Sequence, residues 1–280
     1  MIITRYAIEI GAVRLGFFGL IVVAGLIAGS AVSYWLARRR GEDADALPDM
    51  LALGLFGALL VGRLFYVLNP PPSVAVYYDR HWYLTHVLDL QAGPLALWSG
   101  GLDAAGLWIG AIAGVAWVIW RRRLGVRAWG DLLTPGVLIM LAIAGWANVV
   151  NEQMFGPPTT LPWGVLIGRR VPPYDDLAAY PSDVRFHPTP AYLALWALFV
   201  LGVLWVLAGR YRERLQAGDL ALLASVLYMP ALFAADFLRV DVSHVVDGLT
   251  ATQIVAALIL AVAVVAAVRR WLPSMGLSRH

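Results

Sequence analysis

The stretch that decides the fold is LGFFGLIVVAGLIAGSAVSYWLARRR, residues 15–40, an apolar run that ends in three arginines. The apolar part, about 15–37, is long enough to cross a bilayer as a helix, because a hydrocarbon core of about 30 Å needs roughly 20 helical residues. It exceeds the apolar core of a signal peptide, which has about 7–15 residues, so we expect a retained helix. Arg38, Arg39 and Arg40 predict that this helix ends in the cytoplasm, because basic residues concentrate in cytoplasmic loops.

Six further segments have the length and polarity of membrane-spanning helices. They lie at about 48–68, 96–120, 132–151, 189–208, 219–239 and 250–271. Arginine clusters follow the third, fifth and seventh segments, at 121–123, 210–214 and 269–270. All four clusters agree with an N-terminus outside and a C-terminus in the cytoplasm, an arrangement that requires an odd number of crossings. The sequence therefore predicts an all-α integral membrane protein with seven transmembrane helices.

The composition agrees with a membrane protein. Of the 280 residues, 60% are hydrophobic and 14% are charged, which excludes an ordinary soluble domain. The net charge of +3 comes from arginine, because the chain has no lysine, and no basic stripe interleaved with aromatic residues indicates a nucleic-acid partner. The chain has no cysteine, so a cysteine that takes part in the chemistry must come from a substrate. We expect one polytopic membrane domain over residues 1–280, without a metal or a cofactor.

Two long connections are predicted on the outer side, at about 69–95 and 152–188. The first opens with Asn69-Pro70-Pro71-Pro72, which ends the second helix because proline lacks the amide donor and clashes with the preceding turn. Its tyrosine, histidine and tryptophan residues at 77–83 are typical of a bilayer interface and favour an interfacial anchor. The second connection is rich in proline, and its length is compatible with a lid, a binding segment or a spacer.

Polar and charged side chains gather at the outer ends of four predicted helices. They are Arg63, Asn148, Asn151, Glu152, His187, Asp236 and Arg239. An ionisable group at the bilayer centre costs roughly 2.5–3.5 kcal/mol, so such groups are rare and usually functional. The spacing predicts one helical face for Asn148, Asn151 and Glu152, and another for the oppositely charged Asp236 and Arg239. Two arginines with several other donors at this depth favour an anionic phosphate, and a phospholipid headgroup is the nearest such ligand.

Each of these residues also has a structural interpretation. Arg63 can anchor its helix at the interface, and Asp236 with Arg239 can form a structural ion pair. The two asparagines can hydrogen-bond between helices, a contribution of about 1 kcal/mol or less each. His187, which precedes a proline, can cap the start of the fifth helix. The residue types therefore leave both a binding site and a set of structural contacts open.

Other residues are predicted to shape the helices. Asp131 and Asp219 are expected to begin the fourth and sixth helices and to cap their first turns, where a carboxylate complements the helix dipole. Pro230 predicts a kink in the sixth helix. Gly100-Gly101 at the start of the third helix permits close approach of the backbone to another helix or to a ligand.

Several short motifs follow one another in a recognisable order. They are Ile10-Gly11 with Phe18-Gly19-Leu20, Gly62 to Leu68, Gly93 to Leu102, Asp131 to Asn151, Phe155-Gly156, Leu161-Pro162-Trp163, His187-Pro188-Thr189 with Tyr192, Asp236 to Arg239, and Leu249-Thr250 with Gln253. In their order and spacing, the chain from about Ile10 to Trp271 resembles the bacterial prolipoprotein diacylglyceryl transferases. The resemblance implies seven helices and an outside N-terminus, in agreement with the topology inferred above.

The resemblance also implies a function and a location. It implies transfer of diacylglycerol from phosphatidylglycerol, or another anionic phospholipid, to the lipobox cysteine beside the signal peptide of a prolipoprotein, in the bacterial cytoplasmic (inner) membrane. The matching positions are His187, Glu152 and Asp236 as candidate catalytic bases, and Arg63, Asn148, Asn151, Gly156, Tyr192 and Arg239 as candidate substrate-binding residues. Asp236 stands where the family usually has glutamate, which keeps the carboxylate but shortens its reach.

The chain departs from the family pattern at several positions that carry chemistry. Gly145 and Leu232 replace arginines, Trp98 or Ser99 replaces a histidine, Phe18 replaces a tyrosine, Leu193 replaces an acid, and Gln153 replaces an acid unless Glu152 substitutes for it. Removing one electrostatic stabiliser from an active site costs about 10²–10³ in rate. The sequence therefore also supports an alternative, a catalytically impaired or repurposed paralogue that binds phospholipid and acts as a membrane binding or assembly partner.

Overall fold

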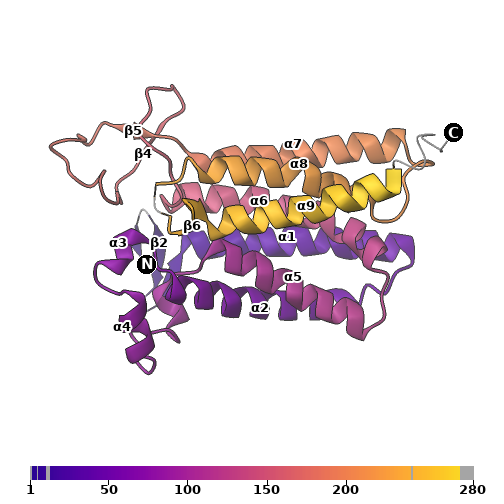
Figure 1. Ribbon diagram of the computed structural model, residues 1–280, viewed down its shortest axis with the longest axis horizontal. Helices are drawn as coiled ribbons and strands as arrows, with labels where there is room; N and C mark the ends of the chain where they lie inside the picture. The colour runs from indigo at the N-terminus through magenta and orange to yellow at the C-terminus, as the bar shows by residue number, and fades with distance from the viewer. Residues whose placement is uncertain (1, 5, 11–12, 241, 272–280) are drawn as a thin grey trace.

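The computed structural model describes residues 2–4, 6–10, 13–240 and 242–271. Within these residues, seven helices are long and apolar enough to cross a membrane, which confirms the predicted number. They are α1 (Phe17–Arg40), α2 (Ala46–Leu68), α5 (Ala104–Arg121), α6 (Val126–Val150), α7 (Thr189–Arg210), α8 (Asp219–Asp236) and α9 (Ala251–Trp271). All seven run along the long axis of the molecule (Figure 1), and the protein is a multi-pass membrane protein.

Close backbone contact holds the helices in pairs. A Cβ atom at Gly110 of α5 would lie 2.0 Å from the carbonyl oxygen of Gly57 on α2, and one at Gly136 of α6 would lie 2.3 Å from the carbonyl oxygen of Gly29 on α1. Only glycine permits such an approach. Small residues commonly line helix contacts in membranes, because lipid tails are as apolar as leucine and packing has to hold the helices together.

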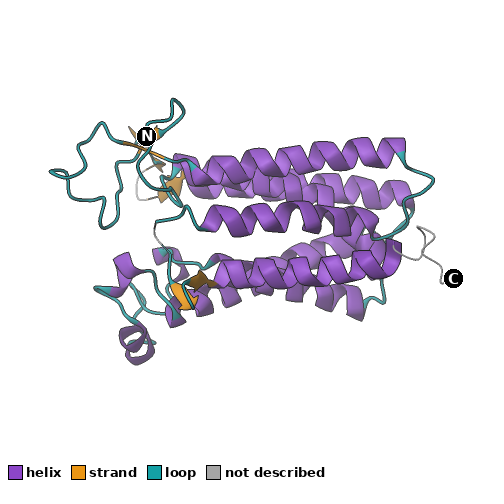
Figure 2. Cartoon of the chain, turned by 45° about the horizontal axis from the view of Figure 1, so that its top comes forward, coloured by secondary structure: helices purple, strands orange, loops and turns teal. Residues whose placement is uncertain are grey.

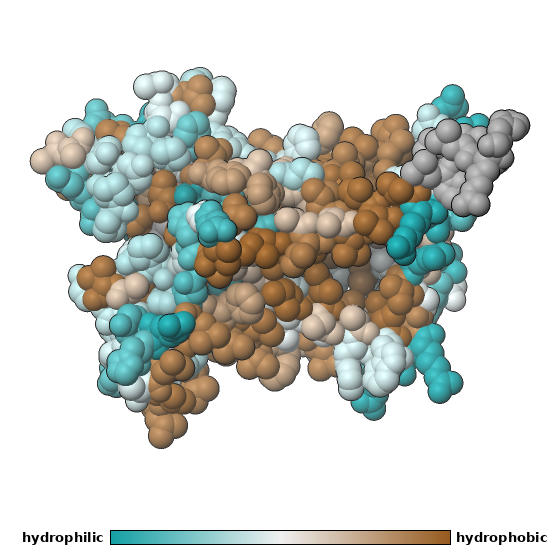
Figure 3. Space-filling model, in the orientation of Figure 1, coloured by the Kyte–Doolittle hydropathy of each residue, from teal (hydrophilic) through white to brown (hydrophobic). Residues whose placement is uncertain are grey.

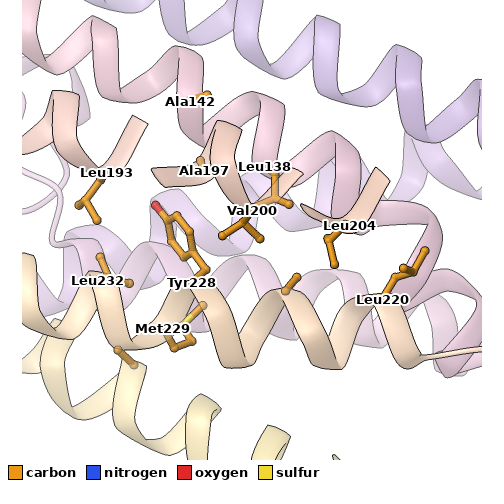
Figure 4. Close-up of a cluster of buried hydrophobic side chains, with 12 residues drawn as sticks. Leu138, Ala142, Leu193, Ala197, Val200, Leu204, Leu220, Tyr228, Met229 and Leu232 are labelled. Atoms are coloured by element: carbon orange, nitrogen blue, oxygen red, sulfur yellow. The ribbon is translucent and has the colours of Figure 1, made fainter. Parts of the chain in front are cut away.

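A second contact region joins α6, α7 and α8 through large apolar side chains. Leu138 of α6, Val200 of α7 and Leu232 of α8 belong to one buried cluster, into which Tyr228 also projects (Figure 4). The surface outside this cluster is apolar as well. Figure 3 shows hydrophobic residues over the middle of one face and hydrophilic residues gathered at both ends, the pattern expected of a protein that crosses a bilayer.

The two ends of the bundle differ. The short connections with the arginine clusters lie at one end, and the long connections lie at the other (Figures 1 and 2). This other end, called here the loop end, is formed by residues 69–103, 151–188, 237–240 and 242–250. The loop end contains α3 (Pro72–Ala75), α4 (Arg80–Thr85), the 3₁₀ turn η1 (Leu97–Ser99), the hairpin of β4 (Val165–Leu166) and β5 (Arg185–Phe186), and the hairpin of β6 (His244–Val246) and β7 (Leu249–Thr250). Most polar residues singled out above lie at this end.

A small antiparallel sheet precedes the first helix and was not predicted from the sequence. It contains β1 (Ile2–Ile3), β2 (Ala7–Ile10) and β3 (Val13–Gly16) in the order β1-β2-β3. The strands are too short to give a clear signal in the sequence, and among the described residues β2 pairs with both β1 and β3.

Four predicted helix boundaries were wrong. The first segment, predicted at 15–37, ends at Arg40, so α1 includes the three arginines. The third segment, predicted at 96–120, becomes helical only at Ala104, because Gly100 and Gly101 have φ angles of 84° and 81° that interrupt the helix. The fourth, predicted at 132–151, already begins at Val126 and ends at Val150. The sixth, predicted to reach Arg239, ends at Asp236.

The early start of α6 changes the role of Asp131. This carboxylate lies inside α6 and does not cap that helix, as the sequence had predicted. It accepts hydrogen bonds from the backbone nitrogens of Gly218, at 2.8 Å, and Ala221, at 2.9 Å, so it caps the start of α8 from a neighbouring helix. Asp219, the first residue of α8, pairs instead with Arg270 at the end of α9.

Candidate active site

The loop end holds an ion pair that joins α8 to the connection after it. Asp236 is the last residue of α8, and Arg239 lies in the following turn. The guanidinium NH1 donates to Asp236 Oδ1 at 2.7 Å, and the side chains of Asp236 and Arg239 are 1% and 15% exposed. Thr250 Oγ1 donates to the other oxygen, Asp236 Oδ2. Both carboxylate oxygens are therefore occupied, and the pair is shielded from solvent.

The start of α9 fixes this threonine. Thr250 and Gln253 form a reciprocal cap, in which Gln253 N donates to Thr250 Oγ1 at 3.1 Å and Thr250 N donates to Gln253 Oε1 at 2.9 Å. Because the threonine hydroxyl also donates to Asp236, the cap ties the first turn of α9 to the last turn of α8. The spacing Thr-x-x-Gln signals such a cap in a sequence.

Gly156 is the point at which three connections meet. Its backbone nitrogen donates to the carbonyl oxygen of His187 at 2.8 Å, and Val240 N donates to Phe155 O at 3.3 Å. A Cβ atom at Gly156 would lie 2.8 Å from the carbonyl oxygen of Leu238 and 2.9 Å from His187 Cβ. No side chain fits here, so glycine brings His187 and the turn that carries Arg239 together.

His187 is held by aromatic neighbours. Its Nδ1 atom lies 3.0 Å from the hydroxyl oxygen of Tyr192, which also accepts a hydrogen bond of 3.0 Å from Trp163 Nε1. His187 follows β5 and precedes α7, which begins at Thr189 as predicted, but it does not cap that helix, because the N-terminal cap residue is Pro188. The half-buried imidazole therefore has a defined orientation at the loop end.

Two polar groups near this junction lack partners. Arg239 donates one hydrogen bond to Asp236, out of the five that a guanidinium can make, and its buried Nε has no partner among the described residues. Thr189 Oγ1 is likewise buried without a partner in the described part of the chain, and it would lie 2.9 Å from a Cβ atom at Gly156. Buried donors normally have acceptors, so these groups indicate a place for an acceptor ligand.

Arg63 has a different environment. It is 5% exposed and donates four hydrogen bonds to backbone carbonyls of the connection before α5. The acceptors are Gly93 O at 2.7 Å, Pro94 O at 3.0 Å, Gly101 O at 3.0 Å, and Gly100 O. Most of its donors are therefore occupied, and the contacts given for Arg63 do not connect it to Arg239. It holds the turn that leads into α5.

The predicted common face of Asn148, Asn151 and Glu152 was wrong. The helix ends at Val150, and Glu152 has a φ angle of 56°, which turns its side chain away from the helical path. Its Oε2 accepts hydrogen bonds from Gly168 N at 2.7 Å and Arg169 N at 2.9 Å. Glu152 therefore secures the 151–188 connection.

The two asparagines are half-buried at the end of α6. Asn148 Nδ2 donates to the carbonyl oxygen of Ala144 in its own helix, at 3.0 Å. Asn151 is the C-terminal cap residue of α6. Within the described residues, neither asparagine is hydrogen-bonded to Arg239 or His187. The site that the contacts assemble consists of Gly156, His187, Tyr192, Asp236 and Arg239.

Asp103 is a site residue that the sequence analysis missed. It directly precedes α5, and its Oδ1 accepts hydrogen bonds from Ala105 N at 2.9 Å and Gly106 N at 3.2 Å. Burial raises the pKa of Asp103, the charge of Arg239 lowers it, and the charge of Asp236 raises it. Asp103 therefore lies within electrostatic range of the Arg239–Asp236 pair. An aspartate before Ala104-Ala105-Gly106 is a helix-start signal that marks this position in the sequence.

Gly145 lies at a tight contact between α6 and α7. A Cβ atom there would lie 2.7 Å from both Ala194 Cβ and the carbonyl oxygen of Pro190. The two helices are therefore too close for any side chain at this position. Trp98, one of the positions considered as a replaced histidine, is 71% exposed and donates from Nε1 to Leu90 O at 3.0 Å.

These features define a class of protein: a seven-helix membrane protein with a buried arginine–carboxylate pair and a histidine at one end of the bundle. A family model described as prolipoprotein diacylglyceryl transferase matches residues 5–269. The chain belongs to the prolipoprotein diacylglyceryl transferase family.

Relatives that are named for this activity align with most of the chain. It is 32% identical to a phosphatidylglycerol–prolipoprotein diacylglyceryl transferase of Chloroflexus aggregans, over 80% of this chain and 72% of that protein. It is 31% identical to the protein of that name from Gloeobacter violaceus, over 94% of this chain and 90% of the relative. For the Frankia alni protein of that name, the identity is 34%, over 94% of this chain and 65% of the relative.

Proposed function

We propose that the protein transfers diacylglycerol from phosphatidylglycerol to the thiol of a lipobox cysteine beside the signal peptide of a prolipoprotein, in the bacterial cytoplasmic membrane. The observation that carries this proposal is the arginine at the end of α8, which is held by Asp236 while its buried Nε has no partner among the described residues. An arginine with free donors at the level of lipid headgroups suits a phosphate with two or more oxygens. The names of the relatives agree with this chemistry.

In the proposed reaction, the sulfur attacks the glycerol carbon that bears the phosphate ester, and glycerol phosphate leaves. Negative charge develops on the departing phosphate oxygen, where Arg239 stabilises it. The substrate supplies the nucleophile, since the chain has no cysteine. Asp236 keeps the guanidinium in place, and His187, oriented by Tyr192, lies close enough to the same turn to contact the substrate.

The other predicted site residues take supporting roles in this proposal. Arg63 orders the turn before α5, because its guanidinium donates to backbone carbonyls of that turn. Glu152 orders the 151–188 connection, because its Oε2 accepts from two backbone N–H groups there. Asn148 and Asn151 lie at the loop end of α6 and are candidates for contacts to the lipid headgroup. Gly156 leaves the space in which the turn that carries Arg239 packs against His187.

A second candidate function is phospholipid binding without transfer. The observation that favours it is the close contact at Gly145, which leaves no room for the arginine that the family resemblance implies at this position. A site with one cation fewer still attracts an anionic headgroup, but it stabilises the leaving phosphate less well. In this case the protein would act as a membrane binding or assembly partner.

The test is an assay of purified protein with phosphatidylglycerol and a lipobox peptide, combined with complementation of a strain depleted of its own transferase. Thioether product that is lost in Arg239→Ala and strongly reduced in His187→Ala supports transfer. Absence of product from the wild type, with phosphatidylglycerol retained through purification, supports binding alone. Arg80→Ala is the control, because Arg80 is exposed on α4 and belongs to none of the contacts described.

A further inference from the structure

We propose that Asp103 is the base that removes the proton from the substrate thiol. This inference rests on the proposed function and adds a catalytic residue to it. Asp103 lies outside the motifs that carry the family resemblance, because the relevant stretch, Gly93 to Leu102, ends one residue earlier.

The position of Asp103 is fixed by two neighbouring helices. Its backbone nitrogen donates to the carbonyl oxygen of Gly62 on α2, at 3.0 Å. Arg63 binds the carbonyls of Gly100 and Gly101 just before it, and a Cβ atom at Gly101 would lie 2.8 Å from the guanidinium NH1. Because the buried Arg63 orders this turn, it keeps the Asp103 carboxylate in a fixed position.

The two oxygens of the Asp103 carboxylate have different surroundings. Oδ1 accepts from Ala105 N and Gly106 N, which locks the side chain over the first turn of α5. Oδ2 has no hydrogen-bond partner among the described residues, and this oxygen is not fully buried. One oxygen therefore orients the group, while the other remains accessible to a proton donor.

The remaining acids at the loop end are less suited to this task. Both oxygens of Asp236 are occupied, one by Arg239 and one by Thr250. Glu152 accepts from two backbone N–H groups of the 151–188 connection through Oε2, so it secures that connection. Asp103 is partly buried within electrostatic range of the Arg239–Asp236 pair, and desolvation by burial is the main cause that raises its pKa above that of an ordinary aspartate.

The titratable groups around Asp103 come from two elements. Arg239 and Asp236 act on its charge from the end of α8, and Arg63 with Tyr66 lies on the α2 side of the Gly100–Gly101 turn. A base beside the arginine that receives the phosphate is the arrangement that the transfer needs, because the attacking sulfur and the leaving oxygen bind the same carbon.

The proposed step is balanced without a redox partner. The S–H bond breaks and the proton moves to Asp103 Oδ2, while the sulfur electron pair forms the bond to the glycerol carbon. The carbon–oxygen bond to the phosphate breaks, and its electron pair leaves on glycerol phosphate beside Arg239. Asp103 then returns the proton to water.

The experiment measures thioether formation by Asp103→Asn and Asp103→Ser between pH 5.5 and about pH 9. Asparagine and serine both cap helices well, so each variant keeps the first turn of α5 while removing the base. Asp79→Asn is the matched control, because Asp79 caps α4 in the same way through Trp82 N, at 2.7 Å, away from Arg239. Thermal melting and retained phospholipid verify that each variant is folded.

At pH 7 we expect kcat to fall by about 10²-fold or more in both Asp103 variants, as for the loss of a general base, with little change in KM for phosphatidylglycerol. The remaining rate should rise about tenfold per pH unit up to the thiol pKa of about 8.5, because the reaction then depends on free thiolate. The deficit of the variants therefore shrinks as the pH rises. Asp79→Asn should retain the wild-type rate.

Two results would overturn the inference while leaving the proposed function intact. One is a wild-type rate in either Asp103 variant. The other is a loss by the same factor at every pH, since that pattern indicates a structural effect. A wild-type protein that forms no thioether at any pH contradicts the proposed function itself, and the role of Asp103 fails with it.

Discussion

Arg239 NH1 lies 2.7 Å from Asp236 Oδ1, and this single contact holds a guanidinium whose other donors lack partners among the described residues. The acid is almost completely buried, so its charge is compensated by Arg239 and by the hydroxyl of Thr250. A buried pair of this kind contributes little net stability, because desolvation offsets the Coulomb attraction. In the proposed function its value is positional, since Asp236 would hold the Arg239 guanidinium in place for an anionic ligand.

Asp236→Asn tests this positional role. Asparagine has the same shape and can still contact Thr250, but it loses the charge that holds Arg239. We expect the rate of thioether formation to fall by about 10²-fold, the loss typical of a misplacement of about 1 Å at a reacting centre. The measurement is product formation by mass spectrometry at saturating phosphatidylglycerol. Asp183→Asn, an exposed position on the 151–188 connection, is the control, and an unchanged rate in Asp236→Asn would contradict the role.

Arg63→Ala is expected to lower stability. The substitution leaves the carbonyls of Gly93, Pro94, Gly100 and Gly101 without their donor, and each buried unsatisfied group costs about 1–3 kcal/mol when water cannot replace it. Arg63→Lys should restore only part of the loss, because a single ammonium cannot reach four carbonyls in a fixed fork. Thermal melting in detergent and protease sensitivity of residues 93–103 are the measurements.

Arg80→Ala, on the exposed surface of α4, is the matched control and should melt as the wild type does. If Arg63 instead binds lipid phosphate in the resting protein, Arg63→Ala will release copurified phosphatidylglycerol without a change in melting temperature. That outcome contradicts a role in ordering the turn.

The seven spanning helices were predictable, because apolar length and arginine clusters are local properties of the chain. The third helix was predicted with a wrong start because Leu97–Ser99 is as apolar as the helix that follows, and the conformation of Gly100 and Gly101 outweighs that signal. The orientation across the membrane remains a prediction from the arginine clusters.

The partners of buried polar residues were much less predictable. Asp131 caps a helix start 87 positions further along the chain, and Arg63 binds carbonyls 30 or more positions away. Helical periodicity places a residue on a face but says nothing about the loop that covers that face. Arg239 and Asp236 were correctly paired because they are three residues apart, where local geometry decides the contact.

Gly145→Ala should destabilise the protein. Its Cβ atom would lie 2.7 Å from Pro190 O and from Ala194 Cβ, so α6 and α7 must separate, and overpacking of this kind costs about 1–3 kcal/mol. Gly202→Ala is the matched control, because a Cβ atom at Gly202 in α7 meets nothing within 4 Å. Melting temperatures of the two variants provide the comparison. Equal melting temperatures of the two variants would contradict a tight α6–α7 contact at Gly145.

The charge of Asp103 is expected to make stability depend on pH. Burial raises the pKa of this carboxyl above its ordinary value of 3.8. In the window above pH 3.8, the folded state therefore binds more protons at Asp103 than the unfolded state does. The free energy of unfolding therefore falls as the pH rises through the pKa that Asp103 has in the folded state. The stabilisation from protonated Asp103 is fully present only below pH 3.8, the ordinary pKa of the group.

Asp103→Asn removes this titration but keeps the cap of α5, so it should melt at a higher temperature than the wild type at pH 7. The difference should shrink toward pH 4, where the wild-type carboxyl is increasingly protonated. Melting curves at both pH values, with Asp79→Asn as the control, measure the effect. A residue that only stabilised the fold would show the reverse, a lower melting temperature at pH 7. If Asp103 serves the reaction, Asp103→Asn should be more stable than the wild type and should also transfer diacylglycerol more slowly.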